Sequence, residues 1–454
     1  MLKKTLLAVA IAAVLVIIAL IYIGWPDKAR LDVAAVSGER PQITTPRKQM
    51  IPTVGVAEVV GWQNGAMPIP AAGLNVQPFA KGFEHPRWLY RLPNGDVLVS
   101  ETNSPPRKGG GITGVVMGWL LGRAGAGVPS ANRITLLRDA NGDGVAETRS
   151  VFLTGLNSPS GMVVVGDSLY VANTDALLRF PYTLGETSIT AKGEKIIDLP
   201  GGGNHWARNV IASPDGSRLY VAVGSASNIA EKGLAAEKNR ATILEVDPER
   251  KYMRIYGSGL RNANGMAFEP TSGRLWTVVN ERDMLGSDLA PDYLTSVEFG
   301  DQFGWPWSYW GGYVDKRVQP ERPDLLQYTR RPDYALGPHV AALGLTFAAD
   351  AKLGAKFANG AFIGLHGSWN RKPLSGYKVV YVPFAANGYP VKGAKPVDVL
   401  TGFLNADEKA QGRPVSVITD ATGALLVADD VGNTIWRVSA KAPAAAAAPA
   451  AAAK

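Results

Sequence analysis

Cysteine is absent from all 454 residues, which excludes disulfides, thiolate metal sites and cysteine nucleophiles. Histidine is rare, with four residues in the chain, and no two of them have the spacing of a zinc-type pair. The sequence also lacks a phosphate-binding P-loop, a dinucleotide-binding glycine turn and the turn that carries a nucleophilic serine. Any metal ion must therefore use oxygen or histidine ligands.

A concentrated run of basic residues is also missing. The formal net charge is +8, but the lysines and arginines are scattered and do not alternate with aromatic residues. This pattern argues against nucleic-acid binding. The positive charge could instead bind an anionic small molecule or an anionic membrane surface.

Long helical patterns are scarce. The 51 glycines and 31 prolines are spread between short apolar runs, which is typical of many tight turns. The composition therefore predicts an all-β protein.

One long hydrophobic run is present, over residues 5–25, and it has about the ~20 residues that a helix needs to cross a bilayer. Lys3 and Lys4 precede it, the run is longer than a typical signal core, and no small-x-small cleavage site follows Trp25. Residues 1–26 are therefore predicted to form an uncleaved single-pass anchor in the inner (cytoplasmic) membrane, with the catalytic domain in the periplasm. A cleaved signal peptide is the alternative.

The rest of the chain divides by composition. Residues 27–75 are predicted to be a Pro-rich tether with a possible first strand, and residues 76–438 to be one folded domain. Residues 439–454 consist almost entirely of alanine and proline, and are predicted to be a disordered tail.

A strand-turn-strand pattern occurs six times in the predicted domain. Each copy has an apolar strand, a turn rich in Gly, Asp or Pro, and a second apolar strand that ends in polar residues; the copies begin at Trp88, Gly161, Asn209, Gly265, Gly344 and Val415. The gaps leave room for two more strands per copy, so the repeat predicts a six-bladed β-propeller. Two stacked β-sandwiches would not require the same signature six times.

The polar residues of the repeat fall at one end of the predicted strands. If the first strand of each copy is innermost, residues before the first strands and after the second strands share one face. These residues are 85–87, 205–209, 261–262, 339 and 411–413, and 101–103, 173–175, 225–228, 280–283, 366–371 and 429–430. All four histidines belong to this set, which predicts a functional face at one end of the axial channel.

Six arginines of this face would converge from different blades: Arg87, Arg208, Arg261, Arg282, Arg371 and Arg413. Their donor forks suit a flat or multiply anionic small molecule. Each could instead pair with an acid such as Glu101, Glu281 or Asp283 and hold the propeller together. His205, with Asn204 beside it, is a candidate general base that would take a proton from a hydroxyl group.

Five segments carry a family resemblance: "GGGNHWARNVIASPDG", "GLRNANGMAFEP", "NERDMLGSDLAPDYLTSVEFGDQFGWPWSY", "GLHGSWNRKPLSGYKVVYVPF" and "GRPVSVITD". Together they resemble the glucose/sorbosone dehydrogenase family over residues 75–438, and they are most similar to its L-sorbosone dehydrogenase-like branch. The resemblance implies a six-bladed quinoprotein that uses pyrroloquinoline quinone (PQQ) and calcium.

The resemblance also implies roles for individual residues. His205 matches the catalytic base, and Arg261 and Asn262 match the pair that contacts the reactive carbonyl region of the quinone. The remaining residues implied to bind the cofactor are Arg208, Asn209, Arg371 and Arg413, where Arg371 is preferred to Lys372 as the match to a lysine of the fifth blade. Backbone carbonyls of Glu281, Arg282 and Asp283 match the calcium loop, although soluble glucose dehydrogenases have Gly-Pro where this chain has Arg282 and Asp283.

The predicted function is a quinoprotein dehydrogenase that oxidises an aldose or a sorbosone-like aldosone. Asn204, Trp305 and Trp307 are candidate sugar contacts, although the two tryptophans could equally pack between blades. The electron acceptor would be a quinone or a cytochrome. A calcium-dependent lactonase or other hydrolase, and a non-catalytic scaffold, are the alternatives.

A second calcium site is predicted in "DANGDGVAET". Asp139, Asn141, Asp143 and Glu147 have the spacing of oxygen ligands in a calcium loop, and Gly144 permits the turn. An Asx-rich hairpin turn without an ion is the alternative.

Overall fold

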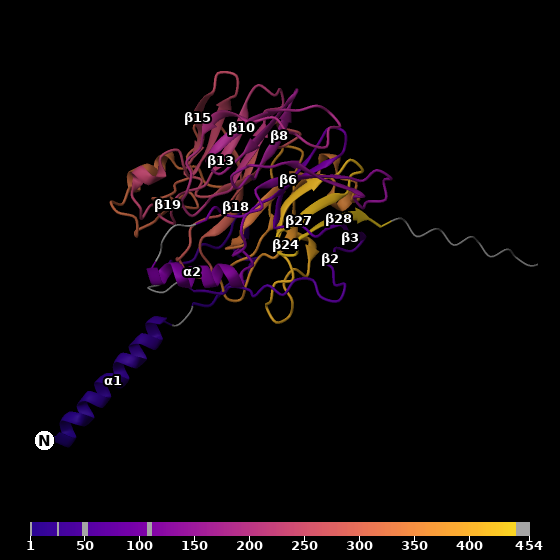
Figure 1. The fold of residues 1–454 in the computed structure, drawn as a ribbon. Helices are drawn as coiled ribbons and strands as arrows, with labels where there is room; N and C mark the ends of the chain where they lie inside the picture. The colour runs from indigo at the N-terminus through magenta and orange to yellow at the C-terminus, as the bar shows by residue number, and fades with distance from the viewer. Residues whose placement is uncertain (1, 25–26, 48–52, 107–110, 442–454) are drawn as a thin grey trace, which may run out of the picture.

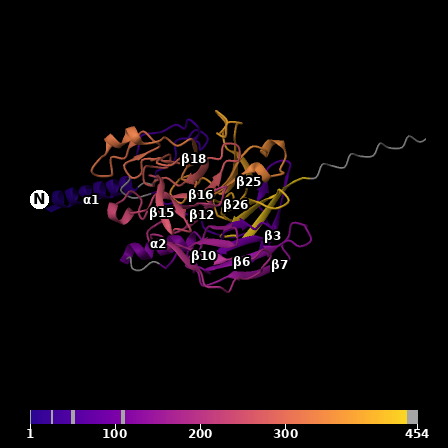
Figure 2. The same ribbon diagram turned by 90° about the horizontal axis from the view of Figure 1, so that it is seen from above.

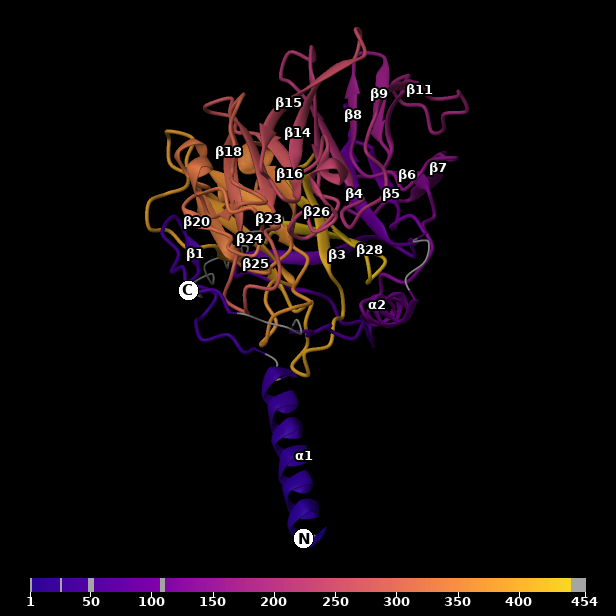
Figure 3. The same ribbon diagram turned by 90° about the vertical axis from the view of Figure 1, so that its left-hand side faces the viewer.

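The computed structural model describes residues 2–24, 27–47, 53–106 and 111–441. Helix α1 (Leu2–Gly24) extends away from the rest of the molecule (Figures 1 and 3). Among the described residues, no helix is both long enough and apolar enough to cross a membrane, so the predicted anchor at residues 1–26 is not supported. Most of the predicted tail, residues 442–454, lies outside the described residues.

Six antiparallel sheets of four or five strands are found among the described residues, which confirms the predicted all-β six-bladed propeller. The first three blades are β4 (Pro86–Arg91), β5 (Val97–Glu101), β6 (Arg133–Arg138) and β7 (Thr148–Leu153); β8 (Met162–Val165), β9 (Ser168–Ala172), β10 (Ala176–Pro181) and β11 (Glu194–Asp198); and β12 (Arg208–Ala212), β13 (Leu219–Val223), β14 (Thr242–Asp247) and β15 (Tyr252–Ser258).

The last three blades each receive a strand from the N-terminal part of the chain. They are β16 (Ala263–Phe268), β17 (Leu275–Val279), β18 (Pro291–Val297), β21 (Tyr334–Pro338) and β1 (Ser37–Gly38); β22 (Ala342–Phe347), β23 (Gly360–Leu365), β24 (Lys378–Pro383), β25 (Val397–Thr401) and β2 (Ile69–Pro70); and β26 (Pro414–Thr419), β27 (Leu425–Asp429), β28 (Thr434–Ala440) and β3 (Leu74–Lys81).

Smaller elements lie in the connections. They are helix α2 (Gly111–Arg123), the hairpin of β19 (Ser308–Tyr309) and β20 (Tyr313–Val314), and the 3-10 helices Leu234–Glu237, Pro323–Tyr328, Ala348–Asp350 and Ala355–Phe357. Helix α2 lies on the same side of the propeller as α1 (Figures 1 and 2).

The first strand of every blade is innermost, as the repeat predicts. Strands β4, β8, β12, β16, β22 and β26 contact one another in a ring. Glycines at the start of the repeats permit this packing: a Cβ on Gly161 would lie 2.3 Å from the Val210 nitrogen, and one on Gly344 would lie 2.2 Å from the Val415 oxygen. The blades then bury apolar side chains between them, as where Trp276 meets Phe384 edge-on at 5.0 Å.

The N-terminal segment is part of the propeller. Strand β3 pairs with β28 from Leu74 to Lys81 and closes the ring, and the two strands lie side by side in Figure 1. Strands β1 and β2 cover the outer edges of their blades, which removes exposed edge hydrogen-bonding groups. The segment expected to be a tether packs against the domain over residues 27–47 and 53–75. Its hydrogen-bond partners are residues of the propeller some 260 to 370 positions away in the sequence.

Candidate active site

His205 lies between a glycine-rich loop and the start of β12, and its side chain is half-buried. Its Nδ1 is 2.9 Å from the Ser225 carbonyl oxygen and 3.0 Å from Ser225 Oγ. Ser225 Oγ donates its own proton to the Ser227 carbonyl oxygen at 2.6 Å, so both Ser225 oxygens accept from His205. Nδ1 therefore carries the proton, and Nε2 of the neutral ring has the free lone pair.

The surroundings of His205 keep the ring neutral. Burial, and then the positive charge of Arg261, lower the pKa of His205 well below its usual value, and Arg208 adds to the effect. Gly224 provides the room: a Cβ there would lie 2.6 Å from the His205 Cβ and 2.3 Å from Asn262 Oδ1. A neutral imidazole with a fixed tautomer can accept a proton at Nε2.

Arg208 holds the backbone around His205. Its guanidinium donates to the carbonyl oxygens of His205 and Ala207 at 2.9 Å and of Pro200 at 2.7 Å, and the side chain is fully buried. Arg240, which the sequence analysis missed, donates to the same loop at Pro200, at Gly201 and, at 2.9 Å, at Gly202. No motif near Arg240 identified it. Both arginines have donors committed to carbonyl groups of the protein.

The three asparagines that the sequence predicts in the site differ in their environments. Asn209 is buried and donates to the Asn264 carbonyl oxygen at 3.0 Å, across two blades. Asn262 donates to Asn280 Oδ1 at 3.3 Å. Asn204 is exposed, and its backbone nitrogen donates to the Ala226 oxygen at 2.9 Å. Of these three side chains, only Asn204 is open to solvent.

Arg261 is buried, and its side-chain donors are engaged by the protein. Nη2 donates to Asp283 Oδ2 at 2.7 Å and to Asn228 Oδ1 at 2.9 Å. Nε donates to the Asn228 oxygen at 3.2 Å, and Nη1 donates to the Glu281 oxygen at 2.7 Å. This is the pairing with Asp283 that the sequence left open, and quinone contact by Arg261 stays a prediction.

Carbonyl oxygens of the predicted calcium loop accept hydrogen bonds from arginine side chains. The Glu281 oxygen accepts from Arg261 Nη1, and the Asp283 oxygen accepts from Arg282 Nη2 at 2.9 Å and from Asn228 Nδ2 at 3.2 Å. Arg282 is itself buried in an ion pair with Asp315. A cation bound through these oxygens would lie next to two guanidinium groups, so the loop as it stands does not fit calcium.

A buried carboxylate with two histidines lies on the same face. Asp430 Oδ2 accepts from Arg87 at 2.5 Å and from His366 Nε2 at 2.8 Å, and His85 Nε2 lies 3.4 Å away. Burial opposes ionisation of Asp430, but the hydrogen bond from His366 and the charge of Arg87 hold its pKa below the usual range. Burial lowers the pKa of His366 to about 3 and that of His85 to about 4. The sequence analysis placed these residues on the functional face without giving them a role.

Arg87, Arg208 and Arg413 each keep a side-chain donor without a hydrogen-bond partner among the described residues, and in Arg208 this donor is the buried Nε. Arg87 is partly exposed, and its bonds to described residues are made through Nη1 alone. Its guanidinium lies 5.5 Å from the ring centre of Trp206, the neighbour of His205. Arg413 donates through Nε to the His366 oxygen at 3.0 Å and through Nη2 to the Gly367 oxygen at 2.8 Å, and no bond to Nη1 is found among the described residues. The free donors of Arg87 and Arg413 fit the carboxylates of a quinone such as PQQ.

The predicted aromatic wall is only partly available. Trp305 is buried, and its Nε1 donates to the Asn228 oxygen at 2.9 Å, so it packs between elements. Trp307 is half-buried, with the Arg322 guanidinium 5.8 Å from its ring centre. Trp206, also half-buried, is an aromatic side chain next to His205; the sequence placed it on the predicted face but gave it no role.

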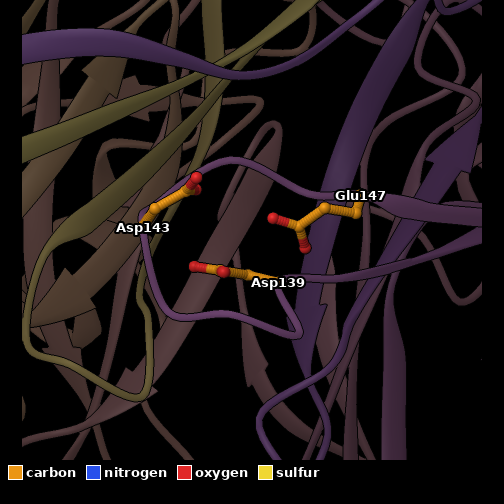
Figure 4. Close-up of side chains that lie close together, drawn as sticks. All are labelled: Asp139, Asp143 and Glu147. Atoms are coloured by element: carbon orange, nitrogen blue, oxygen red, sulfur yellow. The ribbon is translucent and has the colours of Figure 1, made fainter.

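The acidic loop is compact. Carboxylate oxygens of Asp139, Asp143 and Glu147 lie within 4.8 Å of one another (Figure 4), and Asp139 also accepts from the backbone nitrogens of Gly142 and Gly144. The loop joins β6 to β7, at the opposite end of this blade from Glu101, which belongs to the predicted functional face. A metal ion there would act on stability and not on the reaction.

The family of this protein follows from its sequence. Over residues 68–292 and 287–441 the chain matches the family described as TrAA12-like, and it belongs to this family. The resemblance to PQQ-dependent sugar dehydrogenases, which are oxidoreductases, is thereby confirmed.

Two curated relatives are similar over most of this chain. An uncharacterised protein of Borreliella burgdorferi is 27% identical over 362 residues, which cover 77% of this chain and 90% of the relative. A PQQ-dependent pyranose dehydrogenase of Coprinopsis cinerea is 26% identical over 430 residues, which cover 81% of this chain and 54% of the relative. The chain thus spans about half the length of the Coprinopsis relative.

Solved structures share the fold. The holo form of the PQQ domain of the Coprinopsis cinerea pyranose dehydrogenase has a TM-score of 0.66 and 21% identity, covering 85% of this chain and 100% of that domain. A calcium structure of the Trichoderma reesei family AA12 enzyme has a TM-score of 0.66 and 18% identity, with 84% and 100% covered. At 21% and 18% identity, this likeness shows that the fold is shared.

Proposed function

We propose that this protein is a PQQ-dependent dehydrogenase that oxidises a pyranose, an aldose or an aldosone, with His205 as the general base. The observation that carries the proposal is the pairing of His205 Nδ1 with both oxygens of Ser225. It leaves the Nε2 lone pair available on a face that also carries free arginine donors. Membership of the TrAA12-like family supports the reaction class.

Arg87 and Arg413 would hold the carboxylates of the quinone, because they retain donors on this face. PQQ supplies the two-electron acceptor for the carbon-bound hydride of the sugar. Arg208 and Arg240 act differently, since they fix the loop that carries His205.

His205 removes the hydroxyl proton of the sugar at Nε2. The protonated ring is disfavoured by the nearby Arg261 and Arg208, so the proton leaves readily after each turnover. Nδ1 keeps its bond to the Ser225 carbonyl in both states, which holds the ring in one orientation.

Calcium is part of the proposal because a calcium structure of the Trichoderma reesei family AA12 enzyme shares this fold. The acidic loop at Asp139, Asp143 and Glu147 offers grouped oxygens, whereas the carbonyls of residues 281–283 already accept guanidinium donors. A sorbosone-like substrate, a periplasmic location and a quinone or cytochrome acceptor stay predictions.

The deciding experiment adds PQQ, with and without calcium, to the purified protein. We expect a quinone absorbance band that stays with the protein on gel filtration and sugar oxidation only with an artificial electron acceptor. Sugar-lactone hydrolysis without an acceptor, and no retained quinone, would favour the hydrolase alternative. Retained quinone without oxidation of any pyranose, aldose or aldosone would contradict the proposed substrate class.

A further inference from the structure

Residues 283–288, which connect β17 to β18 and are called the clamp loop here, carry the partner of Arg261. Asp283 at the start of the clamp loop accepts from Arg261 at 2.7 Å and from Asn370 Nδ2 at 2.7 Å. Arg261 in turn accepts, through its carbonyl oxygen, the Ser225 backbone nitrogen at 2.7 Å. Ser225 is the residue that orients His205, so the clamp loop is linked to the base by a short series of bonds.

The other end of the clamp loop is held by the N-terminal segment. Asp27 is 6% exposed, and its Oδ2 accepts the Ser287 backbone nitrogen at 2.7 Å, while its carbonyl oxygen accepts Ser287 Oγ at 3.1 Å. Arg47 forms an ion pair with Asp27 and donates its backbone nitrogen to the Leu285 oxygen at 3.0 Å. A buried carboxylate from a segment 260 residues away thus binds the loop directly.

Arg371 ties the same loop to a neighbouring blade. It is 2% exposed, and it donates through Nε to the Ser287 oxygen and through Nη2 to the Leu31 oxygen, both at 3.1 Å. Nη1 donates to the Pro373 oxygen at 2.8 Å. The guanidinium, predicted from the sequence to bind cofactor, therefore joins the N-terminal segment, the clamp loop and the fifth blade.

Close packing around Gly286 restricts the position of the clamp loop. Gly286 has φ 106°, a conformation that side chains disfavour, and a Cβ there would lie 3.1 Å from Asp27 Oδ2. The Gly286 oxygen accepts from His339 Nε2 at 2.9 Å. The tight fit makes the position of the loop depend on the residues packed around Gly286.

We propose that Asp27 and Arg371 are positioning residues for the reaction, because together they fix the clamp loop. The fixed loop keeps Asp283 hydrogen-bonded to the Arg261 side chain, and the Arg261 carbonyl oxygen hydrogen-bonded to the Ser225 backbone nitrogen. The N-terminal segment is then a working part of the active site. The catalytic consequence rests on the proposed function, whereas the effect on the loop does not.

The test compares Asp27→Ala and Arg371→Lys with the parent and with Lys28→Ala, a change at the exposed side chain next to Asp27. In the protein without cofactor, we expect amide hydrogen exchange in residues 283–288 to become at least about tenfold faster in both variants and to stay unchanged in Lys28→Ala. With PQQ bound, kcat should fall about tenfold or more while the KM for sugar changes less than threefold, because orientation of the base is affected and substrate contacts are not.

Each result decides the proposal. Unchanged exchange in residues 283–288 of both variants would overturn it, and so would faster exchange with parental kcat in the loaded enzyme. If the parent retains no quinone, the proposed function fails by itself, and the exchange data still decide whether the clamp exists. Asp27→Asn, which keeps one acceptor oxygen, replaces Asp27→Ala if the latter does not fold, and the same exchange criteria apply.

Discussion

His205 Nδ1 lies 2.9 Å from the carbonyl oxygen of Ser225, a residue twenty positions further along the chain. A backbone carbonyl can only accept, so this contact assigns the ring proton to Nδ1. The serine side chain supports the same assignment, because its proton is given to the Ser227 oxygen. The second ring nitrogen is therefore the basic one.

The pH dependence of the reaction should reflect this environment. Burial and the charge of Arg261 lower the pKa of His205 well below its ordinary value, so the base stays unprotonated as the pH falls through the usual histidine range. We expect kcat/KM for sugar, measured with saturating PQQ, to remain constant from pH 8 down to about 6.5, the ordinary pKa of histidine. An acid limb with its midpoint at or above that pH would contradict the assignment.

The arginines should separate into two groups. Arg87→Lys keeps the charge beside Asp430 but removes the donor fork, so PQQ should bind about ten- to a hundredfold more weakly with little change in Tm. Arg208→Lys should instead lower the free energy of unfolding by about 2 kcal/mol, since it strands buried carbonyls, with a smaller effect on PQQ affinity. Quinone titration and thermal unfolding of both variants check this, and the reverse pattern would refute the grouping.

The His85→Asn substitution should reduce the loss of folding stability at acid pH. The pKa of His85 is lowered by burial from 6.5 to about 4 in the folded protein, so between these values the unfolded chain binds more protons. Stability is therefore lost as the pH falls through this window, by about 3 kcal/mol for a shift of this size. Asparagine cannot take up that proton, and it tolerates the positive φ of 59° at this position.

Denaturant unfolding at pH 7 and pH 4.5 gives the comparison. The loss of unfolding free energy between the two pH values should be smaller in His85→Asn than in the parent, even though the variant is somewhat less stable at pH 7. Equal losses would mean that His85 is not buried in neutral form.

Calcium at the acidic loop is tested by Asp143→Ala. If the loop binds an ion, the variant should lose one calcium per chain and several degrees of Tm in calcium buffer, yet match the parent in chelator. Sugar oxidation should be little changed, because the loop lies at the far end of the blade. Unchanged calcium stoichiometry and Tm would identify the loop as an ordinary Asx turn.

The sequence predicts the propeller well because each blade repeats a local pattern. The glycines that begin several copies, such as Gly344, lie where inner strands come too close for a Cβ. The shared face also follows from strand direction alone, and it correctly grouped His205, Arg261 and Asp430.

The donors of individual arginines could not be predicted in the same way. Whether a guanidinium is free depends on carbonyl groups from distant segments, as when Arg371 bonds to Leu31, 340 positions away. The packing of residues 27–75 against the propeller could not be predicted for the same reason, since the partner of Asp27 is Ser287. Proline content indicates extended backbone but does not reveal what that backbone packs against.

The role of His205 as the base is tested most directly by His205→Ala. The purified variant, loaded with PQQ, is mixed with excess sugar, and reduction of the quinone is followed by absorbance in a single turnover. Because the side chain is half-buried, we expect parental Tm and PQQ affinity with reduction slowed by about 10² to 10⁴. Reduction at the parental rate in a folded, loaded variant would contradict the account.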